Sequence, residues 1–284
     1  MSTNTVPIRV VDGGLSHDVR ASKMVWKREL IRFVNDRIRI ISALVQPILF
    51  LFVLGTGLSS LTNSSTGGVS LRTFLFPGIL ATSSVFTAVF SAASVVWDRE
   101  FGFLREMLVA PIRRSSIVVG KAFGAATVAT AQSCLILLLG PLVGVPYYPM
   151  MIVVVIGETF VLAFMLGALG LVIAANITRL HSMIGLTQML VLPLSFLSGA
   201  MYPISGLPSW LKTLTLINPV TYSVQPIRHT VFGYLDVPDD ARARLDAPIE
   251  WWGWEVPMGV QLMIVVATGL VFLAIAAHLF ERAE

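Results

Sequence analysis

The stretch Trp97–Arg114, WDREFGFLREMLVAPIRR, is a charged helical segment between two long hydrophobic runs. Helical spacing places four apolar side chains on one stripe that can pack beneath a membrane domain: Trp97, Phe101, Leu104 and Leu108. The opposite face carries an aromatic ring among charges: Arg99, Phe103 and Glu106. An aromatic anchor flanked by charges is typical of a helix that docks in a groove on a partner. The alternative is a solvated helix whose Phe103 folds back onto lipid.

The composition around this stretch indicates an integral membrane protein. Of the 284 residues, 55% are hydrophobic and only 13% are charged, whereas soluble domains average about 25% charged residues. The net charge of +4 does not indicate nucleic-acid binding, because the basic residues flank apolar runs, where they set topology. The single cysteine, Cys134, excludes an intrachain disulfide. The polar N-terminus lacks an apolar core, so we expect no signal peptide.

Six apolar runs are long enough to cross a bilayer, which takes about 20 residues. They cover residues 38–58, 75–96, 117–139, 150–174, 183–204 and 257–280. Residues 210–233 are apolar but broken by Pro219 and Pro226, and we expect a re-entrant pair of half-helices there. The sequence therefore predicts an N-terminal region over residues 1–37, a transmembrane domain over 38–280 and a tail over 281–284.

The distribution of charge predicts the orientation of these spans. Basic residues gather before the first run and between the second and third, whereas loops 59–71 and 140–149 contain none. By the positive-inside rule, the N-terminus and the second loop are cytosolic, and an even number of crossings returns the C-terminus to the cytosol. The acidic loop 234–255 then lies outside. We expect a multi-pass protein of the cytoplasmic membrane.

Residues 18–35 predict an amphipathic helix ahead of the first span. Its apolar face contains Val19, Trp26, Leu30, Phe33 and Val34. Arg28 and Arg32 fall on the opposite face, Lys27 lies at the margin, and Lys23 intrudes on the apolar face. A basic helix of this kind should lie in the headgroup plane. It either only anchors the chain or also contacts a partner.

Catalytic chemistry is not expected in this chain. A phosphate-binding loop needs G-x-x-x-x-G-K-[ST], but around Gly120–Lys121 the first glycine is replaced by Ser115 and the final Ser or Thr by Ala122. The four histidines are scattered and predict no metal site. Glu158, by contrast, lies about two turns inside a span, where a carboxylate is costly and indicates function. It either pairs with Lys212, Arg228 or His229, or it meets a substrate or a proton during gating.

Two blocks of sequence resemble a known family. REFGFLREMLVAPIRRSSIVVGKAFGAAT, at Arg99–Thr127, is similar to the signature of permease subunits of ABC-2-type exporters, especially the daunorubicin and multidrug-resistance permeases. LPLSFLSGAMYPISGLPSWLKTLTLINPVTYSVQPIRH, at Leu192–His229, resembles the distal half of the same family. The likeness covers nearly the whole chain. Gln225 and Pro226 depart from the family, which often has an acidic residue followed by a small one, so no role of that carboxylate is carried over.

The resemblance implies an all-α integral membrane protein of the ABC-2, type V exporter kind. It would have six transmembrane helices, an N-terminal amphipathic interfacial helix, a cytosolic coupling helix over residues 97–110 and a re-entrant external helix pair. The coupling residues that the resemblance implies are Asp98, Arg99, Glu100, Phe101, Phe103, Leu104, Arg105, Glu106 and Met107. Secondary cytosolic contacts would come from Lys27, Arg28, Arg179 and His181. The external cap would include Trp210, Pro219, Tyr222 and Arg228.

The expected function follows from this resemblance. The chain would be the permease subunit of an ATP-binding-cassette exporter that moves a hydrophobic drug, lipid or glycan outward, and multidrug efflux or antibiotic resistance is the role expected. Two separate ATPase subunits would bind ATP and Mg, and the permease would pair with itself or a relative. A proton-coupled secondary transporter is one alternative, but it predicts several intramembrane acids and repeated halves. A membrane enzyme or scaffold without transport is the other.

Overall fold

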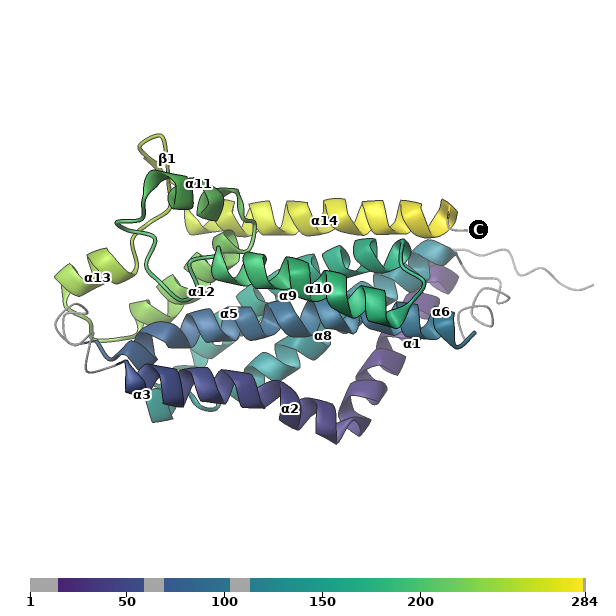
Figure 1. The fold of residues 1–284 in the computed structure, drawn as a ribbon, viewed down its shortest axis with the longest axis horizontal. Coiled ribbons are helices and arrows are strands. Elements are labelled where there is room, and N and C mark those ends of the chain that lie inside the picture. Colours follow the sequence, from purple (N-terminus) through teal and green to yellow (C-terminus); the bar gives the residue numbers. More distant parts are fainter. Residues whose placement is uncertain (1–14, 59–68, 103–112, 283–284) are drawn as a thin grey trace, which may run out of the picture.

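The computed structural model describes residues 15–58, 69–102 and 113–282, which form a bundle of helices packed along one long axis (Figure 1). The helices at the start of the chain are α1 (Leu15–Asn35), α2 (Arg37–Ile48), the π-helix η1 (Leu49–Leu54), α3 (Gly55–Gly57), α5 (Leu71–Ser91) and α6 (Ala93–Glu100). The central ones are α8 (Arg114–Leu137), the 3-10 helix η2 (Gly140–Val143), α9 (Pro149–Ala175) and α10 (Leu180–Phe196). The last elements are α11 (Ser209–Ile217), α12 (Thr221–Gly233), α13 (Asp239–Leu245), a two-stranded antiparallel hairpin of β1 (Glu250–Trp251) and β2 (Trp254–Glu255), and α14 (Met258–Arg282).

Within the described residues, four helical stretches are long and apolar enough to cross a membrane. They are Arg37–Gly57, Leu71–Glu100, Pro149–Ala175 and Met258–Arg282. A shorter apolar helix, Leu180–Phe196, accompanies them, and α8 covers most of the predicted span 117–139. The chain is therefore a mostly helical, multi-pass membrane protein. The fifth predicted span, 183–204, differs most from the structure, because its helix ends at Phe196 and the chain then turns through Gly199 at a φ of +71°.

Capping side chains set several helix boundaries. The Asp36 side chain accepts a hydrogen bond from the Arg39 backbone N–H at 3.0 Å, which separates α1 from α2. Ser70 caps α5 in the same way through the Thr73 N–H. Pro149 occupies the first turn of α9, where its missing N–H costs nothing. Pro47 lies within α2 and is followed directly by the π-helical turn, as expected where a proline removes a helical hydrogen bond.

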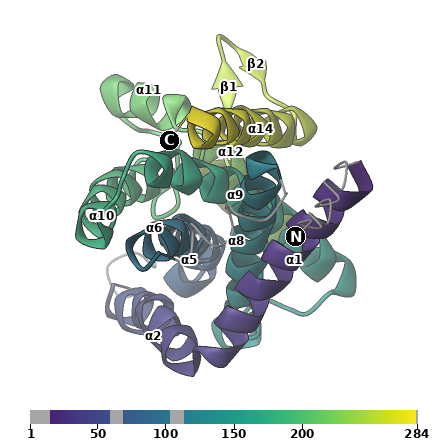
Figure 2. The same cartoon turned by 90° about the vertical axis from the view of Figure 1, so that its right-hand side faces the viewer.

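The core of the bundle is formed by α5, α8 and α9, and the other long helices surround them (Figure 2). The most apolar window of Leu71–Glu100 is 78% buried inside the chain, against 17% for Arg37–Gly57 and 22% for Met258–Arg282. The stretches with low burial therefore present their apolar surface outward, as lipid-facing helices do. Small residues bring the inner helices close, because a Cβ at Gly167 would lie 2.9 Å from the Cβ of Ala125.

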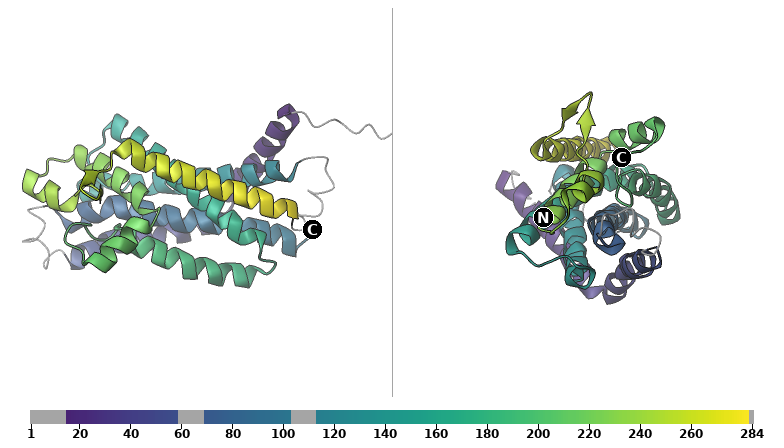
Figure 3. Two further views of the ribbon diagram at one scale, coloured as in Figure 1. Left: turned by 90° about the horizontal axis from the view of Figure 1, so that it is seen from above. Right: turned by 90° about the vertical axis from the view of Figure 1, so that its left-hand side faces the viewer.

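Different helices and strands lie at the two ends of the bundle. One end carries α11, α12, α13 and the hairpin, and the other carries α1, α6 and the C-terminal end of α14 (Figure 1). Seen from above, α14 runs along the bundle while α1 projects from the far end (Figure 3). Residues 103–112, which contain most of the predicted coupling helix, lie outside the described residues.

Candidate functional site: a buried charge cluster where α1, α6 and α8 meet

Lys121, on α8, is the centre of a buried cluster of charges. Its Nζ lies 3.0 Å from Glu29 Oε1 on α1 and 2.8 Å from Asp98 Oδ2 on α6. It also donates to Ser94 Oγ at 3.0 Å. Lys121 is 3% exposed and Asp98 is 1% exposed. Because buried charges are tolerated only when they are paired and hydrogen-bonded, each member depends on the others.

Two arginines of α1 complete the cluster. Arg28 Nη2 lies 2.6 Å from Asp98 Oδ1, and Arg32 Nη1 lies 3.9 Å from the same oxygen. The Arg32 guanidinium also stacks over the Trp97 ring at 5.7 Å. Both oxygens of Asp98 are thus engaged, one by α8 and the other by α1. We call Arg28, Glu29, Arg32, Asp98 and Lys121 the charge cluster.

Glycines on α8 allow this close contact. A Cβ at Gly120 would lie 2.6 Å from the backbone oxygen of Ser22, and one at Gly124 would lie 2.9 Å from the Cβ of Glu29. The buried face of α1 is accordingly made of Val25, Glu29 and Phe33. Val19 and Val34, which the sequence placed on the apolar face, are largely exposed. Helix α1 therefore packs one face against the bundle and leaves the opposite face exposed.

The residues after Asp98 connect α6 to the turn between α9 and α10. Arg99 Nη1 donates to the backbone oxygens of Ile177 at 2.8 Å and Ala175 at 3.3 Å, where a cation offsets the negative end of helix α9. The Leu180 backbone N–H donates to Glu100 Oε2 at 3.1 Å. The end of α6 is therefore attached both to α1 and to the α9–α10 turn.

The predicted coupling residues divide into four groups. Asp98 is buried in the charge cluster, and Arg99 and Glu100 bond to the α9–α10 turn, while Phe101 is 59% exposed. Phe103, Leu104, Arg105, Glu106 and Met107 lie outside the described residues. Of the predicted secondary contacts, Arg28 belongs to the charge cluster, and Lys27, Arg179 and His181 are exposed. The structure brings Arg179 and His181 next to Glu100, because they flank Leu180.

Sequence reasoning missed Glu29 and Lys121 as site residues. Lys121 lies within an otherwise apolar helix, and Glu29 is an acid in a helix that is mostly basic. A lysine among apolar residues and an acid among basic residues are the two sequence signals that indicate a buried ion pair. A wheel drawn for one helix cannot show that the two residues face each other, because they are 92 positions apart.

Glu158 joins α9 to α12. Its Oε1 accepts a hydrogen bond from Thr230 Oγ1 at 2.9 Å, and the residue is 3% exposed. Within the described residues, Oε2 has no hydrogen-bond partner. The predicted pairing of Glu158 with Lys212, Arg228 or His229 is wrong, because α12 turns Thr230 toward α9 while Arg228 and His229 point elsewhere.

Arg228 and its neighbours stabilise the end of the bundle that carries α11 and α12. The Arg228 guanidinium is fully buried, lies 4.8 Å from the Phe74 ring centroid and donates to the backbone oxygens of Gly199 and Ala200 at 2.7 and 3.1 Å. Among the other predicted cap residues, Tyr222 Oη donates to the Leu216 oxygen, Trp210 is exposed, and Pro219 lies at the break between α11 and α12.

Gln225 departs from the resembled pattern for a visible reason. Its Nε2 donates to Asp246 Oδ1 at 3.1 Å and to the Ala247 backbone oxygen at 2.8 Å. His229 Nδ1 lies 2.7 Å from Asp246 Oδ2. Burial raises the pKa of the Asp246 carboxyl, so a second carboxylate at position 225 would add like-charge repulsion to an already unfavourable site. An amide donor suits this position.

The family assignment rests on comparison with known proteins. The family model described as ABC-2 type transporter matches residues 20–232, which include most of α1, the charge cluster and nearly all of α12. The chain belongs to the ABC-2 type transporter family. The family predicted from the two sequence blocks is thus confirmed, and this ABC-2 chain is a membrane subunit of a transporter.

Individual relatives agree. The ycf38 protein of Cyanophora paradoxa, which carries a transport-permease name, is 31% identical over 211 residues and is matched over 71% of each chain. Nodulation protein J of Rhizobium leguminosarum bv. viciae is 28% identical over 217 residues, covering 74% of this chain and 81% of the relative. The inner membrane transport permease YadH of Escherichia coli K12 is 27% identical over 225 residues, covering 77% and 85%.

Proposed function

We propose that this ABC-2 permease is the membrane-spanning subunit of an ATP-driven exporter whose ATPase docks on residues 97–110. The observation that carries the proposal is the charge cluster, in which Asp98, at the start of this segment, ties α6 to α1 and α8. A force applied to the segment is then transmitted to three helices at once, rather than being absorbed by a loose loop. Closure of the motor shifts the permease only if the docked contact differs between its two states.

The proposed topology has six crossings with both termini in the cytosol. The helices α8 and α10 would add two crossings to the four stretches whose length and hydropathy suffice. The location of α1, α6 and the end of α14 at one end of the bundle supports a single cytosolic side in the cytoplasmic membrane (Figure 1). The pair α11 and α12 would then cap the exit at the outer side.

The proposed complex contains two permeases, identical or related, and two copies of a cytosolic ATPase that hold ATP and Mg. The substrate class is a hydrophobic drug-like compound, a lipid or a glycan. The exposed end of the α9–α10 turn, with Arg179 and His181, offers a second contact for the same ATPase beside Glu100.

Alanine at Phe103 and lysine at Glu106 test the docking segment. If Phe103 is an anchor in a motor cleft, Phe103→Ala should cost about 2 kcal/mol of docking, roughly a thirtyfold loss of affinity. ATPase co-purified with the permease and ATP-dependent efflux should both fall, while the amount of permease in the membrane stays constant. Charge reversal at exposed Glu250, at the other end of the bundle, is the matched control for Glu106→Lys. Wild-type efflux and co-purification in both docking variants would remove the coupling assignment.

A glutamine at position 158 tests whether the intramembrane carboxylate takes part in gating, as we propose. The amide oxygen of Glu158→Gln still accepts the Thr230 hydrogen bond, so the apparent Tm should change little. The loss of a titrating group should flatten the pH dependence of transport. Thr230→Val is the matched variant, because it removes the hydrogen bond and retains the carboxyl. If Glu158→Gln transports like the wild type at every pH, Glu158 serves only packing.

A further inference from the structure

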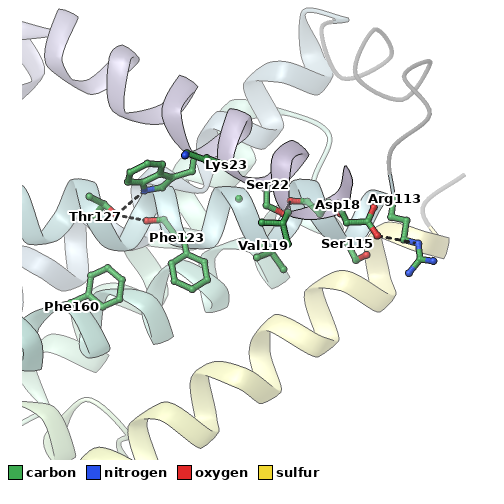
Figure 4. Close-up of a pocket in the computed structure, with 13 residues that line it drawn as sticks. Asp18, Ser22, Lys23, Arg113, Ser115, Val119, Phe123, Thr127 and Phe160 are labelled. Carbon is green, nitrogen blue, oxygen red and sulfur yellow. Dashed lines mark hydrogen bonds and ion pairs between the residues drawn. The ribbon is translucent and has the colours of Figure 1, made fainter. Parts of the chain in front are cut away.

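A groove lies beside the charge cluster. It measures about 760 Å³, a size usual for small-molecule and lipid sites, and it runs between α1 and the first half of α8 (Figure 4). Three of its lining side chains are charged: Asp18, Lys23 and Arg113. Its apolar wall includes Val19, Trp26, Val119, Phe123 and Phe160. Neither the coupling contacts nor the cap uses these groups.

The groove carries the Asp18–Arg113 pair at one end, and Lys23 lies beside the Trp26 ring toward the other end (Figure 4). Asp18 and Arg113 lie at the end where α8 begins, whereas Phe123 and Phe160 lie at the opposite end (Figure 4). The aromatic end is firmly built, since Phe123 packs against Phe160 and Phe164 with ring centroids 6.3 and 5.4 Å apart. The Trp26 Nε1 donates to Thr127 Oγ1 at 3.0 Å, which satisfies the indole N–H within the wall. A ligand whose charged group lies at Lys23 and whose long apolar part lies against these rings fits this lining.

The charges of the groove select the sign of that ligand. Arg113 Nε lies 3.4 Å from Asp18 Oδ2, so the two groups offset each other and the guanidinium is held at the rim while 68% of its side chain stays exposed. Lys23 is exposed and has no carboxylate within ion-pair distance among the described residues. The groove is therefore left with one uncompensated positive charge. The long side chain of Lys23 can reach toward the headgroup level.

We propose that this groove binds an anionic phospholipid of the leaflet that faces the α1 end of the bundle. Lys23 holds the phosphate, and one acyl chain lies against Phe123 and Phe160. This accounts for the lysine that interrupts the apolar face of α1, a position that a plain interfacial anchor would fill with an apolar residue. The bound lipid stabilises the contact between α1 and α8 that the charge cluster also requires.

Lipid titration of the purified full-length chain tests the headgroup contact. Phosphatidylglycerol and phosphatidylcholine with identical acyl chains are added to delipidated protein, and bound lipid is counted by native mass spectrometry. Phosphatidylglycerol should bind at least about fivefold more tightly, the factor expected for a cation beside an anionic headgroup. Lys23→Gln should remove this preference. Arg20→Gln, an exposed charge of the same helix outside the groove, should not. Equal binding of the two lipids, or equal loss in both variants, overturns the proposal.

A photoactivatable phosphatidylglycerol tests the acyl-chain path. With the reactive group near the end of the chain, adducts should concentrate on the segments around Phe123 and Phe160, and Val119→Trp, which fills the groove, should reduce them several-fold. Adducts spread evenly over the outward faces of α2 and α14 would show annular lipid only and would overturn the site. The result does not depend on whether the permease exports anything.

Discussion

Methionine in place of Lys121 is expected to lower the free energy of unfolding by about 3–5 kcal/mol, the usual cost of removing one partner from a buried ion pair. The loss of stability comes from the two carboxylates that remain buried after the lysine is replaced. Asp98 keeps only its contacts with the α1 arginines, and Glu29 loses its ion-pair partner at 3.0 Å. Both carboxylates stay buried, because the close approach of α1 to α8 leaves no room for water to replace the ammonium group.

Scanning fluorimetry of the purified permease measures this loss. For a chain of this size, the apparent Tm should fall by roughly 6 to 20 °C, at about 2–4 °C per kcal/mol. Lys212→Met is the matched control, because Lys212 is exposed at the other end of the bundle and should change the Tm little. The double variant Lys121→Met with Asp98→Asn should lose less than the two single variants together. A Lys121→Met protein that unfolds like the Lys212→Met control would contradict the assignment of the cluster.

The helices were predictable because hydropathy and capping act locally. Apart from Glu158, a run such as 150–174 is apolar on nearly every face, so its length alone predicts a buried or spanning helix, and α9 covers it from Pro149 to Ala175. The amphipathic helix was likewise predicted to end at Asn35, which is the last residue of α1. Hydropathy does not mark the end of α10, because residues 197–204 continue the apolar run, whereas the chain leaves the helix and turns at Gly199.

The charge cluster was not predictable from single-helix patterns. On a wheel of residues 97–108, Asp98 is only one of several charges, and nothing in that segment distinguishes a solvated carboxylate from a buried one. Its burial depends on Lys121, 23 positions later, and on Arg28, 70 positions earlier. The partner of Glu158 was not predictable for the same reason. The sequence correctly indicated an unusual buried carboxylate, but its partner is the neutral hydroxyl of Thr230, which charge pairing does not select.

The turn after α10 leads to the second large effect. Gly78 lies on α5, and a Cβ there would fall onto the backbone oxygen of Ala200, far inside van der Waals contact. That oxygen also accepts the Arg228 hydrogen bond at 3.1 Å, so it cannot move without weakening the attachment of the cap. Gly78→Ala should therefore destabilise the chain by about 3 kcal/mol or more, the upper range of overpacking effects, because backbone rather than a flexible side chain must yield.

Gly157→Ala supplies the comparison that isolates this cause. Gly157 is also a helical glycine, but a Cβ at that position would meet nothing within 4 Å. Alanine there should leave the Tm unchanged or raise it slightly, since alanine favours a helix over glycine by up to about 1 kcal/mol. The two variants make the same chemical change in the same kind of backbone, so a difference between their Tm values reports only the contact between α5 and the Gly199–Ala200 turn. If Gly78→Ala is as stable as Gly157→Ala, Gly78 does not contact the Ala200 backbone, and the turn that Arg228 anchors must lie farther from α5.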